Sequence, residues 1–368
     1  MQILNLKLLN FRNYEKLDIN FDSTKNIIIG KNGMGKTNIV EAIYVLAFTK
    51  SFRGSKDDVI IKNNTDLTRI EGTVKEKYKN DYKIIIKSNS KKVKINNTNI
   101  DRLSDYLSNI NIILFNSEDL KLIKDTPGTR RKLFNIELSQ FSNEYLKLLN
   151  MYNKLLKQRN NYLKTIYYNS NASLDYLDIL TDQLIEIGLR VYEYRKKFID
   201  DISIYISNNY KKIANKDGLK LIYKSDFLDK TKEELKKLYK KEQQRDIVLG
   251  KTNKGIHHDD FEFSLNNFLI KDYGSEGEQK NAVISLKMAE LDIFRDQKGI
   301  TPILILDDLF SELDEEKINN ILSFIDDDIQ TFVTTTELDK LSDKLINDSK
   351  IFVVDSGTVR EEKYENWV

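Results

Sequence analysis

GKNGMGKT, at residues 30–37, decides the fold, because it meets the pattern G-x-x-x-x-G-K-[ST] of a phosphate-binding loop. An apolar run at residues 26–29 precedes it and predicts a buried strand, and a helix-length segment at residues 38–47 follows it. In this arrangement the glycines let backbone N–H groups converge on a β-phosphate, and the helix N-terminus adds positive potential. The sequence therefore predicts a nucleotide bound at this loop.

The loop residues have distinct expected roles. Lys36 adds a full positive charge and is a candidate catalytic residue, and the Thr37 hydroxyl is expected to ligate Mg²⁺. ATP and Mg²⁺ are therefore the expected cofactors. The candidate nucleotide-binding residues of the loop are Gly30, Lys31, Asn32, Gly33, Met34, Gly35, Lys36 and Thr37.

Composition sets bounds on the rest of the protein. The 368 residues suffice for two domains, and the absence of cysteine excludes disulfides and thiolate metal sites. Charged residues make up 32% of the chain, yet the net charge is only +2, so a strong overall attraction to nucleic acid is not implied. Neither a signal peptide nor a membrane-spanning stretch is evident, and we expect a cytoplasmic protein with no membrane partner.

A second motif, ILILDD at residues 303–308, has four apolar residues followed by two carboxylates. This is typical of a buried parallel strand whose C-terminal end faces a ligand. Asp307 is expected to hold Mg²⁺, and Asp308 to act as the general base that polarises the attacking water. Asp314, in the SELD segment that follows, is a candidate for a turn that crosses a subunit boundary and contacts the nucleotide.

A third motif, SEGEQK at residues 275–280, opens an amphipathic helix and offers a second anion site through Ser275, Gly277 and Gln279. One ATP does not need two such sites from one subunit. We therefore expect this segment to cap the γ-phosphate held by a second copy, so that ATP joins a homodimer. The alternative is an ordinary helix N-cap.

The spacing of the motifs indicates an inserted domain, because Lys36 and Asp307 are 271 positions apart (307 − 36). Heptad-like apolar seams predict two helices of about 30 residues at 134–166 and 177–198, joined by a turn at Asn169-Ser170-Asn171. A capping-box pattern at Thr231 predicts a third helix that ends near Gly250. Alternating runs predict strands at residues 4–8, 17–21, 67–74, 82–87 and 93–95.

The order of these motifs resembles an ABC-type ATPase of the SMC kind, and more narrowly the RecF family. The resemblance implies an α/β fold in which residues 1–125 and 250–368 form an ABC-ATPase-like head, with a mixed sheet carrying the phosphate loop and an antiparallel β-meander. An inserted α-helical arm at 126–249 would hold the helical hairpin and the third helix. The matching stretches are LLNFRNYEKLDINF at 8–21, GKNGMGKTNIVEAIY at 30–44, KSFRG at 50–54, FNSEDLKLIKDTPGTRRKLFN at 115–135, YNKLLKQRNNYLK at 152–164 and PILILDDLFSELD at 302–314.

The resemblance also implies a function in DNA replication, repair and recombination. It implies ATP-dependent dimerisation, slow Mg²⁺-dependent ATP hydrolysis, and binding to DNA at gaps or single-strand–duplex junctions. The implied partners are RecO and RecR, which help to load the recombinase RecA. The sequence does not identify the DNA contacts, and the candidates are Arg53, Lys83 to Lys94 and Arg130-Arg131-Lys132.

Two other functions are alternatives to this one. An ATPase subunit that energises a transporter would carry a switch histidine where this chain has Thr334-Thr335-Thr336, and would have a short insertion. A nucleotide-gated nuclease of the overcoming-lysogenisation type would need a further acidic domain, for which we expect no room in the 54 residues (368 − 314) after Asp314.

Three features of the resemblance are looser. Glu118 stands where related ATPases place a Q-loop glutamine, which makes it a candidate metal ligand. The family motif P-H-R-D-D reads Ile256-His257-His258-Asp259-Asp260 here, a run that leaves metal binding as an alternative, although adjacent histidines diverge in most backbones. Glu276 and Glu278 would weaken γ-phosphate capping unless both point to solvent.

Overall fold

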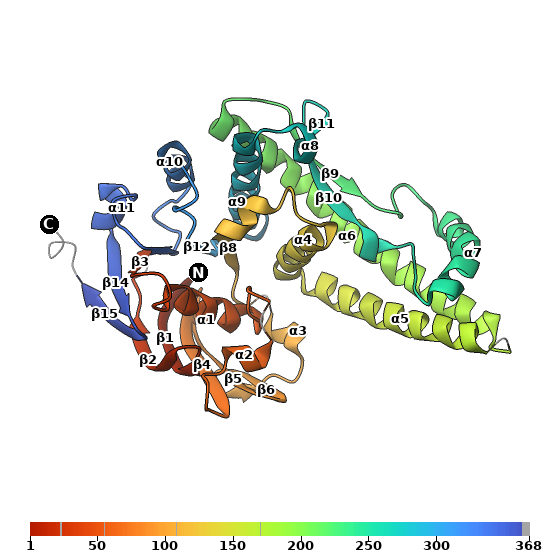
Figure 1. Ribbon diagram of the computed structural model, residues 1–368, viewed down its shortest axis with the longest axis horizontal. Helices are drawn as coiled ribbons and strands as arrows, with labels where there is room; N and C mark the ends of the chain where they lie inside the picture. Colours follow the sequence, from red (N-terminus) through yellow and green to blue (C-terminus); the bar gives the residue numbers. More distant parts are fainter. Residues whose placement is uncertain (23, 55, 108, 170, 363–368) are drawn as a thin grey trace. The chain divides into compact units, whose positions relative to one another are not determined.

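The computed structural model of the protein describes residues 1–22, 24–54, 56–107, 109–169 and 171–362. The chain forms two compact units (Figure 1), one of Met1–Lys121 with Val283–Val368 and one of Leu122–Ala282. This division differs from the predicted boundaries, because residues 250–282 lie in the second unit rather than with the chain ends. No helix in the described part of the chain is both long and apolar enough to cross a membrane.

The first unit contains an antiparallel sheet with the strand order β2-β1-β4-β5-β6-β7. Apolar side chains alternate with polar ones along β4, and every second residue is buried. This is the β-meander that the sequence predicted. The strands are β1 (Gln2–Phe11), β2 (Tyr14–Asn20), β4 (Leu67–Lys75), β5 (Lys79–Lys87), β6 (Ser90–Ile95) and β7 (Thr98–Asn99).

A mixed sheet forms the other half of this unit, with the order β15-β14-β3-β13-β12-β8. All its neighbouring strands are parallel except β15, which pairs antiparallel with β14. The parallel strands β3, β12 and β13 are buried along their whole length, as strands covered on both faces must be. The strands are β3 (Lys25–Ile29), β8 (Ile112–Asn116), β12 (Ile303–Asp307), β13 (Thr331–Thr335), β14 (Ser349–Asp355) and β15 (Thr358–Glu362).

Helix α1 (Lys36–Phe48) lies between the two sheets and contacts β1, β4 and β5 on one side and β12 and β13 on the other. A helix that is apolar all round must be covered on all sides, and Ile39, Val40, Ile43 and Leu46 are each fully buried. This packing fixes the helix whose N-terminus receives the phosphate loop. The other helices of this unit are α2 (Asp57–Ile60), α3 (Leu103–Tyr106), η1 (Ser117–Lys121), α10 (Glu315–Ser323), α11 (Asp343–Asn347) and the larger part of α9 (Glu276–Lys298).

The second unit is mainly helical, with a hairpin of two long helices that pack side by side (Figure 1). A third helix packs on both of them, and a small antiparallel sheet has the order β11-β10-β9. The elements are α4 (Pro127–Phe141), α5 (Asn143–Tyr168), α6 (Leu174–Ala214), β9 (Leu219–Lys224), α7 (Lys232–Leu249), η2 (Ile256–His258), β10 (Asp260–Leu265), β11 (Phe268–Leu269) and α8 (Ile270–Tyr273).

The hairpin differs from the prediction in two ways. The helix predicted at 134–166 is divided, because Ser142 is extended and its side chain accepts a hydrogen bond from the backbone N–H of Tyr145 at the start of α5. Helix α6 continues to Ala214, well past the predicted end, since the buried stripe goes on after Phe198. Ser170, in the predicted turn, lies outside the described residues.

The third helix is confirmed as predicted. Thr231 and Glu234 form a reciprocal capping box at the start of α7, and Gly250 ends the helix with φ of 60°. The left-handed conformation at that position favours glycine, because it has no Cβ.

Candidate nucleotide-binding site

The phosphate loop follows the buried strand β3 and leads directly into α1. Gly33 and Gly35 have φ of 82° and 116°, a region that residues with a Cβ rarely occupy. A Cβ on Gly30 would lie 2.3 Å from the backbone oxygen of Val354 in the neighbouring strand β14. The three glycines of the motif are therefore required by backbone conformation and close packing.

Lys36 lies at the first position of α1 and is only 6% exposed. Its Nζ donates hydrogen bonds to the backbone oxygens of Gly30 at 2.7 Å and Lys31 at 3.2 Å. Burial lowers the pKa of Lys36, and the charges of Asp308 and Asp307 oppose that shift. The structure thus brings the loop lysine close to both aspartates of the second motif.

Asp307 is the last residue of β12 and is 6% exposed. Its Oδ1 accepts a hydrogen bond from the Thr334 hydroxyl at 2.7 Å, and its side chain is also hydrogen-bonded to Thr37. Burial raises the pKa of Asp307, whereas these two bonds and the charge of Arg53 lower it. A threonine hydroxyl beside a carboxylate is a donor set that fits Mg²⁺, which prefers hard oxygen ligands.

Asp308 follows the strand in a left-handed conformation, with φ of 49°. Its backbone N–H donates to the Thr334 hydroxyl at 2.9 Å, and its backbone oxygen accepts from the Ser311 hydroxyl at 2.9 Å. Thr334 therefore contacts both aspartates and fixes the turn between them. Sequence reasoning noted Thr334 only as the position of a transporter switch histidine, and it missed this role.

The turn between β1 and β2 supports the loop from outside. The Asn13 side-chain amide donates to the backbone oxygen of Met34 at 3.0 Å, and the Tyr14 hydroxyl donates to that of Gly35 at 3.1 Å. Burial raises the pKa of Tyr14, so this hydroxyl remains a donor. These contacts were missed, because the motif pattern gives no information on which distant turn packs on the loop.

Glu41 is a buried carboxylate on α1, one turn after Thr37, and its side chain is fully inaccessible. Arg12 binds it through both Nε, at 2.9 Å, and Nη2, and the Ser51 hydroxyl also donates to it. Arg53 places Nη1 at 3.6 Å from its Oε2 and donates to the Asn38 side chain at 3.1 Å. This cluster joins the β1–β2 turn, helix α1 and the segment at residues 51–53. In the sequence, only the charge of Glu41 within an apolar helix could have indicated it.

Two weaker candidates follow the strands β8 and β12 in the chain. Glu118 is exposed in η1, two residues past Asn116, which pairs with Asp307 in the sheet. Asp314 is the N-cap of α10, where it accepts a hydrogen bond from the backbone N–H of Lys317 and pairs with the Lys317 side chain. Their proposed roles at the metal and at a subunit boundary stay predictions.

The S-x-G-x-Q segment lies at the start of α9, in the second unit. Ser275 forms a reciprocal capping box with Glu278, and the amide of Gln279 donates to the backbone oxygen of Gly274 at 2.9 Å. Gln279 is 6% exposed and holds the turn, whereas a Cβ on Gly277 would meet nothing within 4 Å. Of Ser275, Gly277 and Gln279, Gly277 is therefore the residue with open space beside its backbone.

The two acidic residues of this segment are engaged within the unit. Glu276 pairs with Lys280 at 3.1 Å, and Glu278 pairs with Lys216 at 3.1 Å. The negative charge that was expected to oppose capping is therefore partly balanced by neighbouring lysines.

Among the predicted DNA-contact candidates, the basic run at 83–94 lies on β5 and β6, with Lys87 and Lys92 exposed. Arg130 does not fit that role, because it is 3% exposed and binds Asp260 through two nitrogens, at 2.7 and 2.9 Å. The sequence showed an arginine in a basic run and could not show that a carboxylate 130 positions away neutralises it.

The adjacent histidines do not diverge as predicted, since the ring centroids of His257 and His258 are 4.3 Å apart. His257 Nδ1 lies 2.8 Å from the Tyr152 hydroxyl, and His257 Nε2 lies 3.1 Å from the backbone oxygen of Thr252. No group of three or more metal-ligating side chains occurs among the described residues. His257 therefore joins Tyr152 and Thr252 within the second unit, whereas His258 is exposed.

Comparison with known proteins places the chain in a family. The RecF/RecN/SMC N terminal domain model matches residues 2–359. The DNA replication and repair protein RecF of Pediococcus pentosaceus is 36% identical over 374 residues, covering 99% of this chain and 100% of that protein. That of Oenococcus oeni is 38% identical over 370 residues, covering 98% and 99%.

A solved structure agrees with this assignment. The structure of the recombination mediator protein RecF with ATP, in the RecFOR pathway, matches with a TM-score of 0.91 at 29% identity, covering 98% of this chain and 97% of that one. The predicted α/β fold, with an ABC-ATPase-like head and a helical arm, is confirmed. The chain belongs to the RecF family.

Proposed function

We propose that this protein is an ATP-dependent DNA-binding protein of DNA replication, repair and recombination. The observation that carries the proposal is the meeting of Lys36, Thr37, Asp307 and Asp308 at one edge of the mixed sheet. Relatives described as DNA replication and repair proteins, and a RecF structure with ATP, support the same assignment. The alternative of a transporter-energising subunit is not retained, because these relatives are RecF proteins.

In the proposed mechanism the loop N–H groups and the N-terminus of α1 hold the β- and γ-phosphates. Lys36 Nζ exchanges its bonds to loop carbonyls for bonds to phosphate oxygens. Thr37 and Asp307 would hold Mg²⁺, with Glu118 as a further candidate ligand, and the ion would neutralise charge on the phosphates. Thr334 keeps the Asp307 carboxylate directed toward Thr37.

Asp308 is proposed as the general base for hydrolysis. The left-handed turn and the bonds to Thr334 and Ser311 fix the backbone of this residue, so its position is set by the fold rather than by the ligand. An aspartate is one methylene shorter than the glutamate common in transporter ATPases, and we infer slow turnover. Hydrolysis would then act as a release switch rather than as a motor.

The ATP-bound form is proposed to be a homodimer with composite sites. Ser275 and Gly277 of one copy would approach the γ-phosphate held by the other, while Gln279 keeps the turn in shape from inside. Asp314 would lie at the boundary between copies. The openness of Gly277 supports this assignment, because a backbone must come close to a phosphate to bind it.

The proposed DNA target is a gap or single-strand–duplex junction, and the proposed protein partners are RecR and RecO. The related RecF structure, described as a recombination mediator of the RecFOR pathway, supports this proposal. Lys87, Lys92 and Arg53 are exposed enough to contact phosphates, unlike Arg130.

The test is a titration of duplex, single-stranded and gapped DNA with and without ATP, over a salt series whose slope counts phosphate contacts. We expect ATP to tighten binding to gapped DNA about tenfold or more, and Lys36→Ala to abolish that gain while leaving ATP-independent binding unchanged. Equal affinity with and without ATP for all three DNAs would overturn the proposal.

A further inference from the structure

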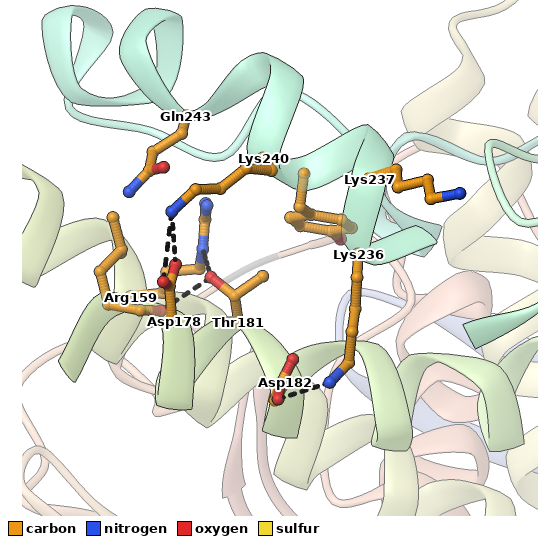
Figure 2. A pocket seen from close by; sticks show the side chains of 10 residues that line it. Arg159, Asp178, Thr181, Asp182, Lys236, Lys237, Lys240 and Gln243 are labelled. Atoms are coloured by element: carbon orange, nitrogen blue, oxygen red, sulfur yellow. Dashed lines mark hydrogen bonds and ion pairs between the residues drawn. The ribbon is translucent and has the colours of Figure 1, made fainter. Parts of the chain in front are cut away.

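Three helices of the second unit enclose a pocket of about 370 Å³ (Figure 2). This volume is at the lower end of the range for small-molecule sites. Helix α5 supplies one side chain, and α6 and α7 supply the others. The lining residues are Arg159, Leu177, Asp178, Thr181, Asp182, Lys236, Lys237, Tyr239, Lys240 and Gln243.

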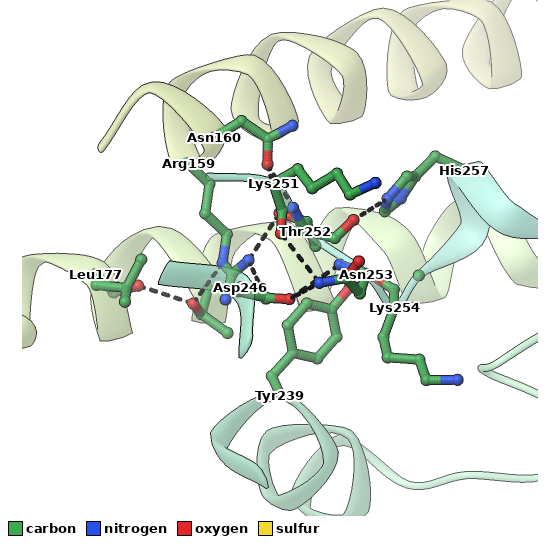
Figure 3. Close-up of polar contacts among 12 residues, drawn as sticks. Arg159, Asn160, Leu177, Tyr239, Asp246, Lys251, Thr252, Asn253, Lys254 and His257 are labelled. Atoms are coloured by element: carbon green, nitrogen blue, oxygen red, sulfur yellow. Dashed lines mark hydrogen bonds and ion pairs between the residues drawn. The ribbon is translucent and has the colours of Figure 1, made fainter. Parts of the chain in front are cut away.

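Arg159 is the fixed element of this pocket and is 1% exposed. Its Nε donates to the Thr181 hydroxyl at 2.9 Å, and its Nη1 donates to Asp246 at 2.8 Å and to the Thr252 hydroxyl at 2.7 Å (Figure 3). The guanidinium carbon also lies 5.3 Å from the centre of the Tyr239 ring. Its position is therefore set by contacts on several sides, and Asp246 balances its charge.

Two donors at this pocket remain unused. The hydrogen bonds of Arg159 to described residues use Nε and Nη1 and leave Nη2, and the buried Nε2 of Gln243 has no acceptor among those residues. The carboxylates that line the pocket are already bound to lysines. A buried donor without a partner costs free energy, on the order of 1–3 kcal/mol. The pocket thus lacks acceptors, which an oxyanion would supply.

The rim consists of ion pairs that a ligand can open. Lys236 binds Asp182 at 2.7 Å and Lys240 binds Asp178 at 3.2 Å, and Figure 2 shows both lysines of α7 reaching toward α6. These pairs are about half exposed, so each is worth roughly 1 kcal/mol or less. A lysine can therefore exchange its aspartate for a ligand oxygen at little cost.

We propose that this pocket binds a small organic anion through a carboxylate or phosphate group. Arg159 Nη2 and Gln243 Nε2 would donate to its oxygens, Lys240 would add charge, and Leu177 and Tyr239 would contact its apolar part. Because α5, α6 and α7 all contribute, the bound anion fastens α7 to the helical hairpin. None of the residues that line this pocket belongs to the proposed nucleotide site.

The test is calorimetric titration of the full chain with inorganic phosphate, with glutamate, and with glutamine as the neutral analogue of glutamate. Lys36→Ala is the background, so that the phosphate loop does not compete. We expect one saturable site for phosphate or glutamate and none for glutamine. Hydrogen exchange should slow in α7 when the anion is added.

Three variants locate the site. Gln243→Leu and Lys240→Ala should each weaken anion binding about tenfold or more. Lys232→Ala is the matched control, because Lys232 forms the same kind of pair with Glu186, at 3.4 Å, one turn away and outside the pocket.

The anion that binds identifies the acidic group of the ligand. Binding of phosphate alone would indicate a phosphate ester, and binding of glutamate alone would indicate a carboxylate. The proposal is overturned if neither anion binds, or if binding is the same in Gln243→Leu, Lys240→Ala and the background protein.

Discussion

The Thr334 hydroxyl donates a hydrogen bond to Oδ1 of Asp307 at 2.7 Å, and the two residues are paired across neighbouring parallel strands. The Thr334 hydroxyl oxygen also accepts a hydrogen bond from the backbone N–H of Asp308, at 2.9 Å. One side chain therefore contacts both aspartates that the sequence assigned to the metal and to the base, Asp307 through its carboxylate and Asp308 through its backbone.

Thr334→Val should raise the pH at which ATP hydrolysis fails. Burial already raises the pKa of Asp307, and the Thr334 bond opposes that rise. Without the bond the carboxylate takes up a proton at higher pH, so Mg²⁺ binding and hydrolysis are lost earlier as the pH falls. The pH–rate profile measures this, with Thr335→Val as the matched control. An unshifted acid limb in Thr334→Val would remove Thr334 from this role.

Asp308→Asn should bind ATP and yet hydrolyse it far more slowly. The amide keeps the size and the backbone contacts of the residue but cannot accept a proton from the attacking water. The loss should be about 10²-fold or more, and the ATP-dependent dimer should last correspondingly longer. Single-turnover hydrolysis and light scattering measure the two effects. Unchanged turnover would exclude Asp308 as the base.

Glu41→Gln should destabilise the first unit by about 2–4 kcal/mol, because it leaves the guanidinium of Arg12 without its buried counter-charge. Urea unfolding followed by circular dichroism measures the change. Glu15→Gln is the matched control, because Glu15 is 84% exposed and its ion pair with Lys62 is long, at 3.8 Å. Its substitution should lower the free energy of unfolding by less than about 0.5 kcal/mol. Equal effects of the two variants would contradict the assigned role of Glu41.

The second unit should lose stability as the pH falls from about 6.5 to about 4. Burial lowers the pKa of His257 from 6.5 to about 4, so in this interval the unfolded chain binds a proton that the folded chain does not. The stabilisation is fully present above pH 6.5, and up to about 3 kcal/mol of it is lost on acidification.

His257→Asn should flatten this pH dependence, as judged from urea midpoints between pH 7 and 4.5. His258→Asn, which changes the exposed neighbouring ring, should retain the wild-type slope. A His257→Asn protein with the wild-type slope would show that another group is responsible.

The sequence predicted the parts of the site that depend on local pattern. The loop at 30–37, the strand ending in Asp307 and the capped helix at Thr231 all follow from residues near one another in the chain. The sequence did not predict contacts between distant segments. The Asn13 bond to Met34 and the Thr334 bond to Asp307 join residues 21 and 27 positions apart, and no pattern marks them.

Arg159 shows the same limit within the arm. It lies within the first predicted helix, at 134–166, but its partner Asp246 is 87 positions away, in a helix whose packing no pattern specified. The division of the predicted first helix at Ser142 was missed because the apolar spacing continues across this residue. The capping bond that starts α5 depends on the extended backbone of Ser142, which the spacing does not show.

In the proposed ATP-bound dimer, one copy holds ATP in its loop and a second copy closes the site with Gly277. The most direct measurement mixes differently tagged Lys36→Ala and Gly277→Asp proteins with ATP and records their association by analytical ultracentrifugation. Gly277→Asp should fold, because a Cβ there meets nothing within 4 Å. Each variant alone should stay monomeric, because both of its composite sites would lack one half. The mixture should form heterodimers, because the intact loop of the Gly277→Asp protein meets the intact Gly277 of the Lys36→Ala protein. A mixture as monomeric as its components, or ATP-dependent dimers of Gly277→Asp alone, would contradict the claim.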